Sequence, residues 1–229
     1  MKICEIVLED SVNPAQVDFD AHEEIRNIIM RDCQPYLTAV GENLKSALSR
    51  PMWRGIQPSD SVSVKLTEKY FTISPIRKDR MPMDTPGSIH SYIDSWFNRR
   101  MGIPFRSHSM FCTGRKIHAQ AYGKAYIVIP IGNFSFCWSP LVEDMYESLR
   151  YYVNDLAKED EDPWVPSNSI ARIKYYMDSE DDVAGFLEDS DYRFNENLDK
   201  AIDSGHEIMI ACNEAIIINP DKLNLNYFG

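Results

Sequence analysis

Hydrophobic positions over residues 18–48 recur at the three- and four-residue spacing of an amphipathic helix. The pattern breaks once, near Pro35, and its apolar positions are Ile25, Ile28, Ile29, Cys33, Leu37, Val40, Leu44 and Leu48. A short apolar run precedes it at residues 3–8 and favours a strand. We therefore expect residues 1–50 to form a strand and a helical cap, and residues 51–229 to form the main domain.

The main domain alternates between strand-like and helix-like patterns. Strands are expected where apolar residues alternate or run together, within residues 61–74, 105–111, 126–131 and 134–138. Helices are expected over residues 86–101, 115–122, 139–156 and 195–204. Charged segments are expected at the surface, at residues 75–86, 158–169 and 177–191.

The last apolar segment, SGHEIMIACNEAIIIN at residues 204–219, begins with a charged residue. Glu207 opens a run that should be buried, and Asn213-Glu214 then has the composition of a turn. This pattern predicts a hairpin. A carboxylate at the start of a buried strand is poorly solvated on one side, which perturbs its pKa and suits it to chemistry.

Strands and helices are interspersed along the chain without a regular βαβ repeat. This order indicates an α+β fold with a largely antiparallel core. The chain has 229 residues, of which 44% are hydrophobic, so it can bury a sizeable core.

The net charge of −11 argues against a general grip on nucleic acid, which requires a basic face. Basic residues nevertheless gather locally, at Lys69, Arg77, Lys78 and Arg80 and again at Arg99, Arg100, Arg106, Arg115 and Lys116. A local basic groove therefore remains compatible with the sequence.

Five cysteines without C-x-x-C spacing argue against a disulfide framework or a structural zinc site and favour a reducing cytoplasm. The five histidines are scattered, and the acidic run lacks the spacing of a calcium loop, so no metal is expected. The chain begins without the pattern of a signal peptide, and no apolar stretch reaches the roughly 18 residues that a membrane span needs.

Three groups of polar residues could carry chemistry. Arg54 in MWRGI can offer a guanidinium fork to a phosphate, while Gly55 lets the backbone approach closely. The stretch PFRSHSMFCTG places hydroxyl groups on and after an expected strand, at Ser107, Ser109 and Thr113. Glu207 is the third candidate.

Four short pieces, in this order, resemble the Arg–Ser/Thr–Glu branch of the ADP-ribosyltransferase superfamily. MWRGI is similar to its arginine-glycine strand, and FCTGRKIHAQAYG to its strand-end hydroxyl with the short helix that follows. AYIVIPIGNFSFCWS is similar to the next apolar strands, and HEIMIACNEAIII to the strand that begins with the catalytic glutamate and to the closing hairpin. The resemblance extends over residues 51–219.

The resemblance implies two small, twisted, mainly antiparallel sheets around a cleft that binds NAD as co-substrate. Arg54 would hold the ribose and phosphate on the nicotinamide side. Thr113 would be the hydroxyl that orders the site, with Ser107 and Ser109 as competing assignments because the segment departs from the family's S-T-S pattern. The side chain of Tyr122, or of a neighbouring aromatic residue, would stack on the nicotinamide.

In the same resemblance, Glu207 would accept a hydrogen bond from the ribose 2′-hydroxyl. Its charge would stabilise the oxocarbenium-like transition state as the bond to nicotinamide breaks. Family members that modify arginine usually carry a second acid two residues earlier, where this chain has Gly205. We therefore expect an acceptor other than protein arginine, and a host protein, a nucleic acid, a small molecule or water stays open.

The expected function is mono-ADP-ribosyl transfer with release of nicotinamide. A NAD glycohydrolase is a close alternative. A binding module without chemistry and a structural or interaction protein, such as part of a virion, are the alternatives from other classes. The aromatic, acidic chain also resembles proteins of tailed bacteriophages, which would place it in the host cytoplasm.

Overall fold

An eight-stranded antiparallel sheet runs through the chain in a computed structural model that describes residues 14–41, 43–81, 85–160, 162 and 164–223. Its strands are β1 (Met52–Ile56), β2 (Phe71–Pro75), β3 (Met110–Thr113), β4 (Lys124–Ile131), β5 (Ser135–Trp138), β6 (Arg193–Phe194), β7 (Glu207–Ala211) and β8 (Glu214–Ile218). The α+β class and the antiparallel core are confirmed. The strand expected at residues 3–8 lies outside the described residues.

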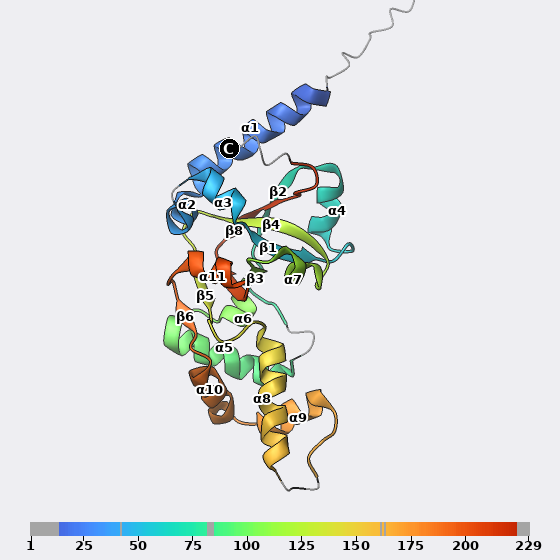
Figure 1. The fold of residues 1–229 in the computed structure, drawn as a ribbon, viewed down its shortest axis with the longest axis vertical. Coiled ribbons are helices and arrows are strands. Elements are labelled where there is room, and N and C mark those ends of the chain that lie inside the picture. The colour runs from blue at the N-terminus through green and yellow to red at the C-terminus, as the bar shows by residue number, and fades with distance from the viewer. Residues whose placement is uncertain (1–13, 42, 82–84, 161, 163, 224–229) are drawn as a thin grey trace, which may run out of the picture.

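Eleven helices surround the sheet in the described ranges (Figure 1). They are α1 (Pro14–Asp32), α2 (Gln34–Val40), α3 (Leu44–Ser49), α4 (Ser61–Glu68), α5 (Gly87–Met101), α6 (Phe105–His108), α7 (Lys116–Gln120), α8 (Met145–Glu159), α9 (Ser169–Tyr176), α10 (Glu180–Asp189) and α11 (Leu198–Ser204).

The strand order β2-β8-β4-β1-β3-β7-β5-β6 forms one continuous sheet, so the expectation of two separate sheets is not met. The two halves meet at β1 and β3. Among the described residues, β1 and β3 are paired at one position, Trp53 opposite Thr113. Strands β1 and β4, in contrast, pair along five positions. The sheet is therefore continuous, but β1 and β3 diverge beyond this one pair.

Strands β7 and β8 do not form the predicted hairpin. Strand β7 pairs with β3 and β5, and β8 pairs with β2 and β4. Both strands are apolar on both faces, and each is flanked by two neighbours in its own half of the sheet. The turn at Asn213 thus carries the chain from one half to the other, and the local pattern could not reveal this.

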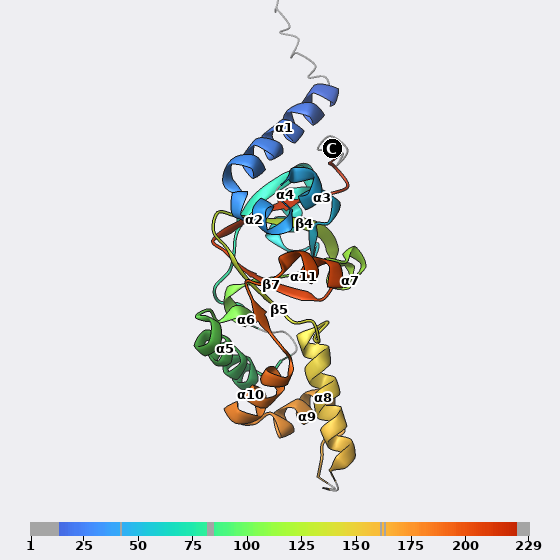
Figure 2. The ribbon, with the colours of Figure 1, turned by 60° about the vertical axis from the view of Figure 1, so that its left-hand side comes forward.

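The two halves have different hydrophobic cores. Helices α1, α2, α3 and α11 pack with the strands into the first core, and α5, α8, α9 and α10 form most of the second (Figure 2). Successive side chains of β7 pack into different cores. Ile208 and Ile210 belong to the first core, and Met209 belongs to the second. By this alternation Glu207 lies on the face of Met209.

Helices α1 and α2, in the segment expected to form a helical cap, pack on the sheet. Ile25 and Ile29 of α1 and Leu37 of α2 are buried in the same core as β4 and β8. The cap thus shares its core with the sheet and closes one side of it.

Two predicted strand segments are partly helical. Residues 61–68 form α4, because the Asp60 carboxylate accepts the N–H of Val62 at 2.8 Å and caps the helix. Residues 105–108 form α6, because the carboxylate of Asp94 accepts the backbone N–H groups of Arg106 and Ser107 at 2.8 and 3.2 Å. Asp94 is distant in sequence, so only the tertiary structure supplies this cap.

Three further helices can be compared with the predicted boundaries. Helix α8 begins at Met145 rather than near 139, because Asp144 is its N-cap. The segment expected as an acidic surface contains α10, whose Val183, Phe186 and Leu187 are buried. Helix α5 ends at Gly102, as predicted.

Replacing Gly114 by alanine should destabilise the fold. An added Cβ would lie 1.7 Å from the carbonyl oxygen of Ile202, a backbone atom that cannot turn away. We expect Gly114→Ala to lower the free energy of unfolding by about 1–3 kcal/mol in chemical denaturation. Gly185→Ala is the matched control: nothing lies within 4 Å, and helix α10 should gain about 0.5–1 kcal/mol. Equal effects of the two variants would contradict the close approach of Gly114 to the Ile202 carbonyl.

Candidate active site

A cleft of about 770 Å³ opens beside the β1–β3 junction, a volume within the roughly 300–1,000 Å³ of ligand sites. Its lining includes five of the residues singled out in the sequence: Arg54, Gly55, Thr113, Tyr122 and Glu207. Four separate parts of the chain thus meet in one cleft. Ser107 and Ser109 do not contribute to this lining.

Glu207 lies at the start of β7, directly opposite Thr113 on β3. Its side chain is 14% exposed, and its Oε1 is 3.3 Å from Nη1 of Arg106, which is 9% exposed. The backbone N–H of Glu207 donates to the carbonyl of Glu143 at 2.9 Å, which ties the strand to the loop before α8. The carboxylate therefore faces the cleft from a fixed backbone position.

Burial raises the pKa of the Glu207 carboxyl above its usual 4.5. The Arg106 guanidinium opposes this rise, and the negative charge of Asp144 adds to it. The carboxylate stands between a basic and an acidic group, which is the setting expected of a functional acid.

The Thr113 hydroxyl connects the end of β3 to the turn before β7. It donates to the carbonyl of Gly205 at 2.6 Å and accepts the N–H of Arg115 at 3.2 Å. These bonds hold in place the turn from which Glu207 follows. Thr113 is thus a positioning group in this structure.

The serine candidates lie away from the cleft. Ser107 is in α6, where its hydroxyl donates to the carbonyl of Pro104, and Ser109 is fully buried and donates to the carbonyl of Phe105. The expected placement of these two serines on a strand is wrong, because the strand begins only at Met110.

Two glycines near the site are required by packing. A Cβ on Gly55 would lie 2.0 Å from the carbonyl oxygen of Ala119, so glycine lets α7 approach β1. Gly205 has φ +76°, and a Cβ there would lie 2.5 Å from the side chain of Arg115. The position of the family's second acid is thus a left-handed turn in this chain.

Three arginines form a basic end of the cleft: Arg54, Arg80 and Arg106. Burial lowers the pKa of Arg54, and burial with repulsion from Arg54 and Arg106 lowers the pKa of Arg80 to about 10. Guanidinium groups are protonated in proteins at neutral pH, so this end of the cleft is basic. The sequence placed Arg80 and Arg106 in two separate basic groups, and no local signal joined them to Arg54.

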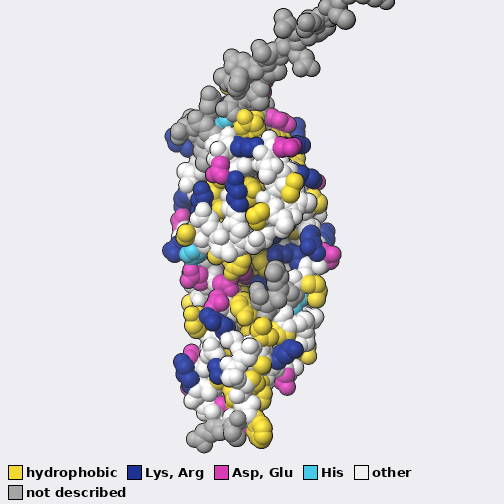
Figure 3. Space-filling view, turned by 90° about the vertical axis from the view of Figure 1, so that its right-hand side faces the viewer, with side chains coloured by type: hydrophobic (Ala, Val, Ile, Leu, Met, Phe, Trp, Pro, Cys, Tyr) yellow, Lys and Arg dark blue, Asp and Glu magenta, His cyan; other side chains and the backbone are white. Residues whose placement is uncertain are grey.

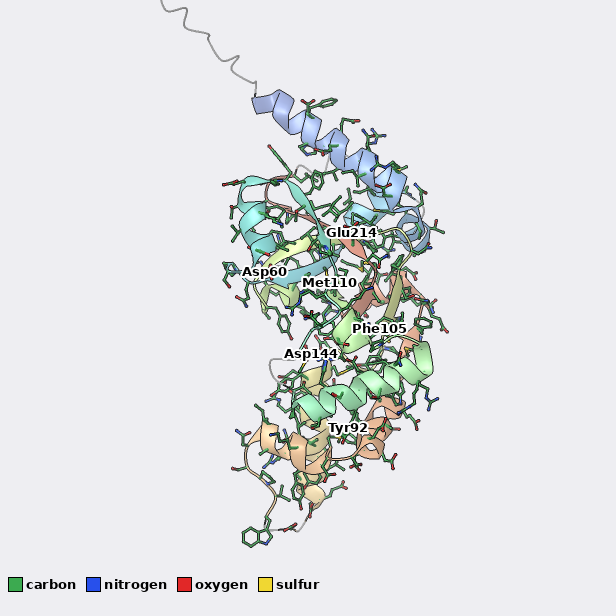
Figure 4. All side chains as sticks on the ribbon, turned by 180° about the vertical axis from the view of Figure 1, so that it is seen from behind. Asp60, Tyr92, Phe105, Met110, Asp144 and Glu214 are labelled. Carbon is green, nitrogen blue, oxygen red and sulfur yellow. The ribbon has the colours of Figure 1, made fainter. Side chains whose placement is uncertain are left out.

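Acidic and aromatic residues gather in another part of the lining, which we call the acidic end of the cleft. Tyr122 donates its hydroxyl to Asp144 at 2.6 Å, and Nδ1 of His118 is 3.4 Å from the carboxylate of Glu143. Asp144 also accepts the N–H of Glu147 at 2.9 Å. Figure 4 shows Asp144 where the upper and lower parts of the molecule meet.

Large apolar side chains at this end are unusually exposed. They are Ile117, Tyr122, Leu141 and Tyr151, each 58–69% exposed. Figure 3 shows this side of the molecule, with acidic side chains near the middle of its length and hydrophobic ones beside them. Together they form an apolar rim around an acidic mouth.

Other chemistries have less support in the cleft. Cys112 lines it, but burial raises the pKa of its thiol to about 12, so the nucleophilic thiolate is scarce at neutral pH. Among the described residues, no cluster of three or more His, Cys, Asp or Glu side chains could hold a metal ion. None of the described helices is both long and apolar enough for a membrane crossing.

Comparison of the chain with protein-family models, curated proteins and solved structures finds no match. The site must therefore be interpreted from its own geometry and charge.

Replacing Thr113 by valine should loosen the link between β3 and the turn at Gly205. The change keeps the side-chain shape but removes the hydrogen bond from Thr113 to the Gly205 carbonyl and the acceptor of the Arg115 N–H. We expect a loss of about 1–3 kcal/mol of unfolding free energy, measured by chemical denaturation. Thr113→Ser keeps the hydroxyl and should retain most of the stability. A valine variant as stable as the parent would rule out this positioning role.

Proposed function

We propose that the protein is a NAD-dependent mono-ADP-ribosyltransferase that releases nicotinamide and transfers ADP-ribose to a macromolecular acceptor. One observation carries the proposal: Arg54, Thr113, Tyr122 and Glu207, which the sequence resemblance selects, line the same cleft. A resemblance by chance would have no reason to select residues that converge.

The division of charge in the cleft supports NAD as the ligand. NAD carries an anionic diphosphate and a cationic nicotinamide ring. The basic end offers Arg54, and the acidic end offers Tyr122, whose hydroxyl is already engaged by Asp144. Glu207 pairs with Arg106 of the basic end, and Asp144 of the acidic end raises its pKa. The ribose that joins the diphosphate to the nicotinamide would therefore lie beside Glu207.

In the proposed reaction the bond between the ribose C1′ and the nicotinamide nitrogen breaks. The electron pair leaves with nicotinamide and neutralises its ring, while C1′ becomes cationic. The Glu207 carboxylate accepts a hydrogen bond from the 2′-hydroxyl and stabilises the new positive charge. A fixed charge in a poorly solvated cleft is most effective on charge that appears only in the transition state.

The acceptor then forms a bond to C1′ and loses its proton. Gly205 supplies no carboxylate for this step, but Glu143 and Asp144 stand at the acidic mouth of the same cleft. The exposed rim of Ile117, Leu141 and Tyr151 favours docking of a macromolecule over reaction with water, because apolar patches of this kind mark interaction surfaces.

Glu207→Gln should nearly abolish nicotinamide release from NAD, because it preserves the shape and removes the charge. We expect a decrease of about 10²–10³-fold, comparable to the loss of one oxyanion-hole donor. Glu214→Gln is the control, since Glu214 also opens a strand, β8, but is exposed and lies outside the cleft lining. Release should be assayed by chromatography with and without cell extract.

The two conditions separate the outcomes. Release that requires extract supports transfer to a macromolecule, and release from NAD alone without labelled protein supports a glycohydrolase. Undiminished release by Glu207→Gln would contradict the catalytic assignment. Absence of both release and NAD-induced thermal stabilisation would favour a structural or interaction protein.

The pH profile of nicotinamide release should report the ionisation of Glu207. Activity requires the carboxylate, so it should fall as the pH falls through a pKa above 4.5. Asp144→Asn removes a negative neighbour that raises this pKa, so the acidic limb should move to lower pH. Asp203→Asn, in an exposed ion pair with Arg50, should leave the limb in place. A shift to higher pH in Asp144→Asn would contradict the proposed environment of Glu207.

A further inference from the structure

We propose that Arg54, Arg80 and Arg106 form a diphosphate-binding subsite in which Arg106 exchanges the Glu207 carboxylate for a phosphate oxygen when the ligand binds. The inference rests on the proposed function for the identity of the ligand, a dinucleotide or nucleoside diphosphate. The subsite itself is argued from the three guanidinium groups.

The three arginines come from different elements and converge around Phe111 on β3. The guanidinium carbons of Arg80 and Arg106 lie 4.1 and 4.6 Å from the centre of the Phe111 ring. Nη1 of Arg54 is 3.4 Å from the Phe111 carbonyl oxygen. One aromatic residue therefore gathers all three groups at the basic end of the cleft.

Backbone contacts hold two of the arginines in place. Arg80 donates its N–H to the carbonyl of Ser107 at 3.3 Å and its Nη1 to the carbonyl of Ser109 at 3.0 Å. Asp94 accepts the N–H of Arg106. The serines that the sequence suggested as site hydroxyls thus contribute carbonyl groups that orient Arg80.

Among the described residues, the guanidinium groups of Arg54 and Arg80 have no carboxylate within ion-pair distance. Glu207 pairs with Arg106, whereas Asp60 raises the pKa of Arg54 without forming an ion pair with it. The Arg106 side chain is buried, and its Nε has no hydrogen-bond partner among the described residues. The guanidinium groups of Arg54 and Arg80 are thus not paired with a carboxylate of the described chain, and arginine forks suit the oxygens of a diphosphate.

Arg106 is the group that a diphosphate and Glu207 would share. Both side chains of the ion pair are largely buried, and the pair faces the cleft. A phosphate oxygen competes for the same guanidinium, and its arrival would leave the carboxylate available to a ribose hydroxyl. As the structure stands, the ion pair gives each of the two buried charges a partner of opposite sign.

Equilibrium binding measured by titration calorimetry tests the subsite, with ADP-ribose and adenosine as probes. The parent protein should bind ADP-ribose at least tenfold more tightly than adenosine, and higher salt should reduce this difference. Arg80→Gln and Arg106→Lys should each weaken ADP-ribose binding at least fivefold with little effect on adenosine. Arg99→Gln, in an exposed ion pair with Glu180, is the control and should bind as the parent does.

A second measurement tests the exchange of Arg106, with ADP as the probe because it lacks the second ribose. Glu207→Gln removes the competitor for Arg106, so the variant should bind ADP more tightly than the parent, by about threefold or more. Weaker binding of ADP by Glu207→Gln would overturn the exchange. Circular dichroism of each variant establishes that it is folded.

The outcomes distinguish this inference from the proposed function. Tight, arginine-dependent binding of ADP-ribose without nicotinamide release would retain the subsite and contradict the transferase. Nicotinamide release with an unchanged KM for NAD in Arg80→Gln and Arg106→Lys would retain the enzyme and overturn the subsite. Equal affinity for ADP-ribose and adenosine in the parent would also overturn it.

Discussion

The parting of β1 from β3 is the constraint on which the rest of the structure depends. The strands meet at Trp53 and Thr113, and beyond this pair the Arg54 guanidinium, rather than a β1 backbone group, contacts the Phe111 carbonyl. A charged side chain thus stands where strand pairing would have continued. Because each half of the sheet has its own core, the halves can diverge here without opening either core. The cleft follows from this divergence.

Burial gives the charges in the cleft their strength. Desolvation disfavours charge, so it raises the pKa of Glu207 and lowers those of Arg54 and Arg80. The structure offsets this cost by pairing Arg106 with Glu207 and by stacking arginines on Phe111. It separates the basic end from the acidic end, where Tyr122 and His118 engage the carboxylates. A ligand with one anionic and one cationic part is complementary to such a cleft.

Local signals predicted the elements whose stability is local. Helices α5 and α11 end before Gly102 and Gly205, because the residue after each helix adopts a left-handed conformation. The apolar runs that predicted buried strands form β4 and β5. The failures share a cause. The cap of α6 comes from Asp94, and the partners of β7 and β8 lie in opposite halves of the sheet. Contacts between distant segments leave no trace in a local pattern.

For the site, the sequence alone determined which side chains are available: an arginine before a glycine, a hydroxyl at a strand end and an acid at the start of an apolar strand. It also determined that position 205 carries no second acid. The tertiary structure decided which of them meet, placed Thr113 but not the competing serines in the lining of the cleft, and added Arg80 and Arg106. The physical reason is that charge and chemistry belong to residues, whereas desolvation and proximity arise only when separate segments pack together.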